Sequence, residues 1–131
     1  MLTAFALVLM SAAAPAEAAV AAAEPQLAAE ILVAGEPSEA IARLERELAF
    51  APYDPAILIN LGVAYAQAGD EARSREAFKA AAAASDSVQL VTANGTEMDS
   101  RSLARRGLRM LENGDLAANT ANAPARLTLS R

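Results

Sequence analysis

The feature that most constrains the fold of this chain is a self-similarity at an offset of 34 residues. Positions that match in size class recur as the pairs Leu27/Leu61, Ala28/Gly62, Ile31/Tyr65, Gly35/Gly69, Glu36/Asp70, Ala40/Ser74 and Leu44/Phe78. A fixed period of about 20 to 50 residues is typical of repeat proteins, in which each unit buries its apolar face against its neighbours. The sequence therefore predicts two structural repeats over residues 21–86.

Each repeat is expected to be a pair of helices joined by a tight turn. Asp54 suits the N-cap of a helix and Pro55 its first position, and apolar residues then recur at helical spacing as far as Gly69. Gly69 supplies the turn, and Asp70 begins a second helix whose inner stripe includes Phe78. The alternative is a plain four-helix bundle with accidental spacing. The glycine–acid pair at the same place in both units favours repeats.

After the repeats the pattern changes from helical to alternating. Residues 88–98 are rich in β-branched side chains and hold Asn94-Gly95 in their middle. Asn-Gly between such runs is the strongest short-range signal of a β-hairpin, and an irregular loop is the alternative. We therefore expect a hairpin and a capping helix over residues 87–113, which together cover Phe78 and its neighbours. A disordered tail is expected over residues 114–131.

The capping helix is expected to begin at Asp99 or Ser100 and to end before Gly114. Four basic residues lie outside its apolar stripe, namely Arg101, Arg105, Arg106 and Arg109. One interpretation is that they bind an acidic ligand or anionic lipid headgroups. The other is a solvated face that pairs with the acidic repeats. The second is favoured, because arginines on the outer face of a capping helix need no ligand.

Composition excludes several classes of function. The chain has no Cys and no His, which removes thiol chemistry, the commonest general base and the commonest metal ligand. The net charge of −5 argues against nucleic-acid binding. The charge is unevenly distributed. Residues 24–86 hold eleven acidic and five basic residues, whereas residues 99–112 hold four basic and two acidic residues. The paired carboxylates Asp70 and Glu71 are explained by a helix start, so we expect no enzyme, no metal and no cofactor.

The first eighteen residues resemble a secretory signal peptide. An apolar stretch from Leu2 to Met10 precedes alanine-rich residues with Ala-x-Ala sites, and cleavage is expected after Ala18. No Lys or Arg precedes the stretch, which departs from the usual pattern. An uncleaved anchor and a packed N-terminal helix are the alternatives, but nine helical residues span roughly 14 Å, about half of the ~30 Å hydrocarbon core. We expect a bacterial protein, periplasmic or secreted, without stable membrane insertion after cleavage.

The repeats resemble the tetratricopeptide repeat family. The matching residues of the second repeat are Leu58, Leu61, Gly62, Tyr65, Gly69, Ser74, Phe78 and Ala81. Those of the first are Leu27, Ala28, Ile31, Gly35, Ala40, Leu44 and Pro52. The chain departs from the family with Leu58 and Glu24 where Trp is usual, Glu47 where a small residue is usual, and Asp86 in place of the closing Pro. The resemblance implies an all-α fold of two helical hairpins, a fragment of a right-handed α-α superhelix.

In that family the first helices of successive repeats line a concave groove that holds a peptide or a partner helix. The resemblance places the groove of this chain at Ala29, Leu32, Val33, Ile59, Asn60, Val63 and Gln67. These residues are mostly apolar with two amides, which suits a peptide with apolar anchors. We therefore expect an exported scaffold or adaptor for a protein or peptide partner. The alternative is a structural subunit that self-associates into a homo-oligomer or docks into a larger cell-envelope complex.

Overall fold

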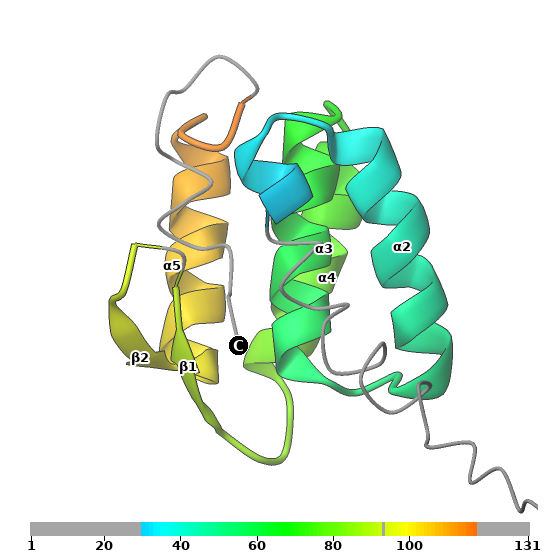
Figure 1. The fold of residues 1–131 in the computed structure, drawn as a ribbon. Coiled ribbons are helices and arrows are strands. Elements are labelled where there is room, and N and C mark those ends of the chain that lie inside the picture. The colour runs from blue at the N-terminus through cyan, green and yellow to red at the C-terminus, as the bar shows by residue number, and fades with distance from the viewer. Residues whose placement is uncertain (1–29, 93, 118–131) are drawn as a thin grey trace, which may run out of the picture.

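The computed structural model describes residues 30–92 and 94–117 of the chain (Figure 1). Residues 30–33 end a first helix, and four helices follow, α2 (Pro37–Phe50), α3 (Pro55–Gln67), α4 (Glu71–Ala82) and α5 (Ser100–Glu112). Two short strands, β1 (Gln89–Val91) and β2 (Glu97–Asp99), lie between α4 and α5. This order confirms a predominantly helical fold with a small hairpin before its last helix. The predicted signal peptide, Ala29 and the predicted tail beyond residue 117 lie outside the described residues.

Consecutive helices pack side by side. Helix α3 contacts α2 and α4, and α5 contacts both α4 and α3, so that α3 lies in the middle of the stack (Figure 1). Short connections between the helices oblige successive helices to run in opposite directions. No helix in the described part of the chain is both long enough and apolar enough to cross a membrane.

Three of these helices begin at an aspartate, as the sequence predicts. The carboxylates of Asp54, Asp70 and Asp99 accept hydrogen bonds of 2.8–3.0 Å from backbone N–H groups of the first turn. Such caps satisfy donors that have no partner within the helix. Of the two predicted starts of the last helix, the structure shows that Asp99 is the cap.

Three helices end with the same geometry. Gly35, Gly69 and Gly114 adopt positive φ angles of 82°, 83° and 75°, which other residues rarely adopt. In each case the acidic residue that follows donates its backbone N–H to a carbonyl in the last helical turn, at 2.8–3.1 Å. This is the glycine cap expected of the Schellman type. The first two endings are the predicted glycine–acid pairs, and the third is a further copy that lies 45 residues after Gly69.

Phe78 of α4 forms the centre of the core, with none of its side chain exposed. It lies between two glycines, Gly62 of α3 and Gly107 of α5. A Cβ atom added at Gly62 would come within 2.7 Å of the Phe78 ring, and one added at Gly107 would also overlap it. Both helices therefore approach α4 closely because they lack a side chain at the contact. The prediction that the last helix covers Phe78 is confirmed.

The predicted hairpin is present but short. Strands β1 and β2 pair antiparallel over three residues each, with Leu90 opposite Met98. Gly95 has a φ of 83° in the turn, as the Asn-Gly signal predicts. At the base of the hairpin, Ser100 of α5 donates its backbone N–H to the Val88 carbonyl at 2.9 Å, and the Ser100 hydroxyl accepts from the Val88 N–H at 3.1 Å. The hairpin is thus fixed to the start of α5.

The predicted boundary of the tail needs a correction. Leu116 was expected in a disordered tail from residue 114, but it is 1% exposed and belongs to the core. The physical reason is the turn at Gly114, whose positive φ reverses the chain and returns Leu116 to the apolar interior. Apolar packing therefore continues beyond the end of α5.

Candidate functional site

Of the seven positions predicted to line a groove, six lie in the described residues, and five of those six are buried. Leu32, Ile59 and Val63 are fully buried, and Asn60 and Gln67 are 2% and 8% exposed. Val33 is 53% exposed, and Ala29 lies outside the described residues. These α3 side chains are buried because the helix lies in the middle of the stack, with α2, α4 and α5 around it. In the described structure these five residues are core residues, and their role in binding a partner stays a prediction.

The buried amide of Gln67 illustrates what these positions do in this structure. Its Nε2 donates to the Leu32 carbonyl at 3.2 Å and so ties the end of the first helix to α3. Its Oε1 is buried without a hydrogen-bond partner. A buried amide used in this way holds two helices together, and its donor is not available for the backbone of a peptide.

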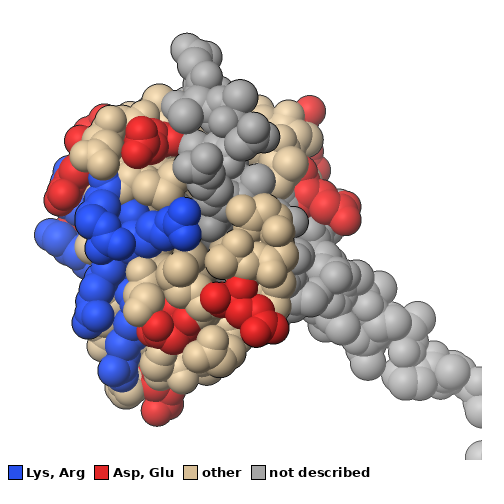
Figure 2. Space-filling view, turned by 90° about the vertical axis from the view of Figure 1, so that its left-hand side faces the viewer, with Lys and Arg blue, Asp and Glu red and all other residues tan. Residues whose placement is uncertain are grey.

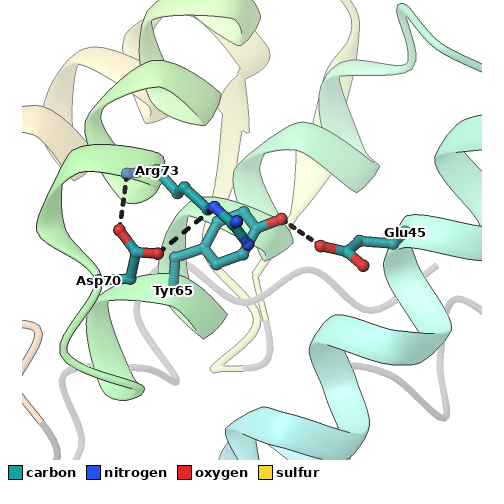
Figure 3. A network of polar contacts seen from close by, with 4 residues as sticks. All are labelled: Glu45, Tyr65, Asp70 and Arg73. Carbon is teal, nitrogen blue, oxygen red and sulfur yellow. Dashed lines mark hydrogen bonds and ion pairs between the residues drawn. The ribbon is translucent and has the colours of Figure 1, made fainter.

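A polar network on another side of the stack joins three helices (Figure 3). The Tyr65 hydroxyl donates to Glu45 Oε1 at 2.6 Å, which links α3 to α2. The Arg73 guanidinium lies 5.7 Å from the centre of the Tyr65 ring, and Arg73 Nε is 3.5 Å from Asp70 Oδ2. Burial, together with the hydrogen bond to Glu45 and its charge, raises the pKa of Tyr65 to about 12. The phenol is therefore a neutral donor that couples the helices, not an acid or base for chemistry near neutral pH.

The titration of this phenol is directly testable. The chain has two tyrosines, so a Tyr53→Phe variant leaves Tyr65 as its sole phenol. Its near-ultraviolet phenolate absorbance is expected to rise with a midpoint at about pH 12, while circular dichroism reports that the protein is folded. The unfolded chain releases this proton near its ordinary value of 10.0, so between these two values the folded state binds more protons. The free energy of unfolding is expected to fall as pH rises through this window.

A matched variant identifies the cause of that pKa. Glu45→Gln retains an acceptor for the Tyr65 hydroxyl but removes the negative charge beside it, so the midpoint is expected to move down. A midpoint at the ordinary tyrosine value in the folded Tyr53→Phe protein would contradict the network in Figure 3.

The arginines of α5 form a basic surface. Figure 2 shows Lys and Arg side chains gathered in one patch on the side of the molecule that carries α5. Arg101 is used structurally, because its guanidinium donates to the carbonyls of Ala84 and Ser85. Within the described part of the chain, no ion pair involves Arg105, Arg106 or Arg109, whose side chains we call the free arginines. Their positive charges are not neutralised by protein carboxylates at contact distance.

This finding bears on the two interpretations of the arginines. The favoured one expected the helix to pair with the acidic repeats, and in the described residues no arginine of α5 does so. The ion pair between these two helices has its arginine on α4 and its carboxylate on α5, since Arg75 lies 3.5 Å from Glu112. Asp99 is engaged as the helix cap, where hydrogen bonds from Ser102 lower the pKa of its carboxyl. Glu112 and Asp99 are thus engaged elsewhere, and the free arginines keep their capacity to bind an anion.

Two of the free arginines border a shallow pocket of about 500 Å³. Its lining combines basic, amide, hydroxyl and thioether groups, from Met98, Ser102, Arg106, Arg109, Met110 and Asn113. Met98 comes from β2 and the others from α5 and the residue that follows it. A volume of this size is within the range of about 300–1,000 Å³ that is usual for ligand sites. The pocket is the candidate functional site of this protein.

The chemistry of this lining is suited to binding and not to catalysis. Arginine, serine and asparagine supply hydrogen-bond donors, while the lining holds no carboxylate or imidazole to act as a general base. Across the described residues, no group of three or more potential metal ligands comes together. The arrangement can bind an anionic group but offers no nucleophile–base pair.

Sequence reasoning missed this pocket, although part of its signal is visible. Ser102, Arg106, Arg109 and Asn113 follow one another at intervals of four, three and four residues, which places them on one face of a helix. The contribution of Met98 could not be found in the same way, because it depends on how the hairpin folds against α5. The spacing indicates a polar stripe on the helix, and only the structure shows that Met98 of the hairpin lies beside this stripe.

Comparison with known proteins gives no match, whether with protein-family models, curated proteins or solved structures. The tetratricopeptide resemblance therefore rests on the residues of the two repeats. The function has to be inferred from the surface that the described residues present.

Proposed function

We propose that this protein is an interaction module, a short tetratricopeptide-type array that binds a partner protein through the basic face of α5. The observation that carries this proposal is the set of free arginines on α5, Arg105, Arg106 and Arg109, of which the last two line the pocket. Arginine is enriched at protein interfaces and contributes strongly to binding when a carboxylate partner replaces water around it. A protein that presents three such side chains on one helix is equipped to bind an acidic surface.

Recurring helix ends support the array. The glycine–acid turns at Gly35 and Gly69 are 34 residues apart, which is one repeat offset. The same turn at Gly114 lies 45 residues after Gly69, which is eleven residues more than that offset. Gly107 likewise lies 45 residues after Gly62, and both glycines contact Phe78. On this proposal α5 is the first helix of a third repeat, displaced by the β-hairpin. The module then consists of two helical hairpins and half of a third.

A protein partner fits the charge distribution better than nucleic acid does. Outside α5 the repeats carry an excess of acidic residues, which repels a long polyanion that extends beyond the basic patch. An acidic segment of a protein can be short enough to contact α5 alone. If the expected signal peptide directs export, the module acts as an adaptor in the periplasm or outside the cell.

Charge reversal on α5 tests the proposal. The variant Arg105→Glu/Arg106→Glu/Arg109→Glu changes side chains at the surface, and circular dichroism is expected to show an unchanged fold. A control, Arg43→Glu/Arg46→Glu, reverses two charges on α2. The wild type and the control are expected to retain a partner from native extracts, identified by mass spectrometry and then bound as a purified protein, while the α5 variant loses it. A partner set unchanged by the α5 substitutions would overturn the proposal.

A second candidate is a structural subunit that self-associates. It is favoured by the turn between α2 and α3, where Phe50 and Tyr53 are 92% and 85% exposed. Exposed aromatic side chains of this size are common at interfaces between subunits. Light scattering on the wild type and on Phe50→Ser/Tyr53→Ser separates the two. A stable oligomer that dissociates in the variant would support the subunit, and a wild-type monomer would reject it.

A further inference from the structure

We propose that the pocket beside α5 binds the carboxylate side chains of an acidic peptide segment, with one apolar side chain of that segment seated on Met98 and Met110. This inference rests on the proposed function, because it identifies the kind of partner that the basic face takes. It assigns separate tasks to the arginines and to the methionines.

The charge of the ligand follows from the donors. Arg106 and Arg109 lie three residues apart on α5, so their Cβ atoms are about 5–6 Å apart, and both residues line the same pocket. A guanidinium has five N–H donors and no acceptor, and its fork matches the two oxygens of a carboxylate. Ser102 and Asn113 extend the stripe of donors at its two ends. The complementary group is therefore an anion with more than one acceptor oxygen.

The apolar part of the ligand follows from the two methionines in the pocket lining. Met98 lies on β2 and is half-buried, and Met110 of α5 is 8% exposed. Met98 is the hairpin residue that lines the pocket, while the carboxylate of its neighbour Asp99 is engaged as the cap of α5 by the backbone N–H of Ser102. Methionine side chains are flexible and polarisable, and they adapt to different apolar partners. The hairpin thus adds an apolar group to the lining of the pocket.

A peptide fits these features better than a membrane does. A lipid surface would be contacted by exposed apolar side chains that insert next to the basic residues. The two most exposed large apolar side chains of the described residues, Phe50 and Tyr53, instead lie on the turn between α2 and α3. A shallow site of about 500 Å³ that is lined by hydrogen-bond donors and thioethers accommodates a few side chains of an extended chain.

The test uses a synthetic peptide, Asp-Glu-Leu-Glu-Asp with blocked termini, titrated into the full chain by isothermal titration calorimetry. Its controls are the isosteric Asn-Gln-Leu-Gln-Asn peptide, which removes the charges, and Asp-Glu-Ser-Glu-Asp, which removes the apolar anchor. Arg106→Ala and Arg109→Ala are each expected to weaken binding by about tenfold or more, the loss that follows from one hydrogen-bonded charge pair. Arg46→Ala is the matched control, because it removes an exposed arginine of α2, away from the basic face of α5. We expect it to weaken binding by less than about threefold, as for an exposed charge. Arg105 lies on α5 but does not line the pocket, so Arg105→Ala is expected to weaken binding less than Arg106→Ala does.

The outcomes separate this inference from the proposed function. Equal losses for Arg105→Ala and Arg106→Ala would show a diffuse electrostatic contact, which overturns the pocket but leaves the basic face as the interaction surface. Equal binding of the acidic and the amide peptide would overturn the carboxylate assignment. Binding to phosphatidylglycerol vesicles that depends on Arg106 and Arg109, without peptide binding, would overturn the peptide in favour of a lipid. A captured partner whose binding ignores all three arginines would reject the proposed function itself.

Discussion

A Phe78→Ala variant is expected to lose about 3–5 kcal/mol of its free energy of unfolding, the range found for removal of a buried aromatic ring. Phe78 has no exposed surface and is the largest fully buried side chain of the described core. Its ring contacts α3 and α5 from α4, so its loss opens a cavity between three helices at once. Small domains are stable by about 5–15 kcal/mol, so this single change is expected to bring the protein close to unfolding.

Urea denaturation followed by far-ultraviolet circular dichroism measures this loss. Phe50→Ala is the matched control, because it removes the same ring at a position that is 92% exposed. Its free energy of unfolding is expected to change by no more than about 0.5 kcal/mol, as for most surface substitutions. Equal effects of the two variants would contradict the central position of Phe78.

A Gly107→Ala variant is expected to be destabilised although alanine is the better helix former. In an open helical position this change stabilises by about 1 kcal/mol. Here the new methyl group would overlap the Phe78 ring, whose surroundings leave it no free volume. Overpacking of this kind costs about 1–3 kcal/mol, so the overlap outweighs the gain in helix propensity. Gly62→Ala is expected to act in the same direction for the same reason.

A double-mutant cycle attributes the effect to the ring. Phe78→Leu removes part of the volume that the Gly107→Ala methyl group would meet, so the two changes together are expected to cost less than the sum of their separate costs. The measurement is the free energy of unfolding of all four proteins in urea. A stabilised Gly107→Ala protein, or strict additivity with Phe78→Leu, would contradict the close contact between α5 and α4.

Local signals explain why so much of the fold could be predicted. Asp54, Asp70 and Asp99 each cap a helix because a carboxylate satisfies free backbone donors whatever the rest of the chain does. Gly35 and Gly69 end helices because glycine adopts positive φ without strain. Such features depend on a few neighbouring residues, so the sequence contains them fully.

Features that depend on distant residues could not be predicted. The end of the last helix at Gly114 was expected, but its likeness to the turns at Gly35 and Gly69 was not, because the hairpin shifts it away from the 34-residue offset. The pocket combines a helix stripe with Met98 of a different element. The spacing of residues within the hairpin or within α5 does not predict where the hairpin lies or that it contacts α5.

The groove positions show what the sequence leaves open. In a long array, a face of each first helix is left free, and Ile59 and Val63 were assigned to that face. In this chain α3 is the middle helix of a short stack, and both side chains are fully buried. Their apolar character is equally consistent with a core position, and the sequence alone did not distinguish the two environments.

The central claim is that this protein binds an acidic partner segment at the pocket beside α5. Backbone amide chemical shifts of the isotope-labelled full chain, recorded during titration with the Asp-Glu-Leu-Glu-Asp peptide, test it most directly. The largest changes are expected at Met98 and from Ser102 to Asn113, with saturation at increasing peptide. Changes concentrated on α3 around Ile59 and Val63, or an absence of saturable changes on α5, would contradict the claim.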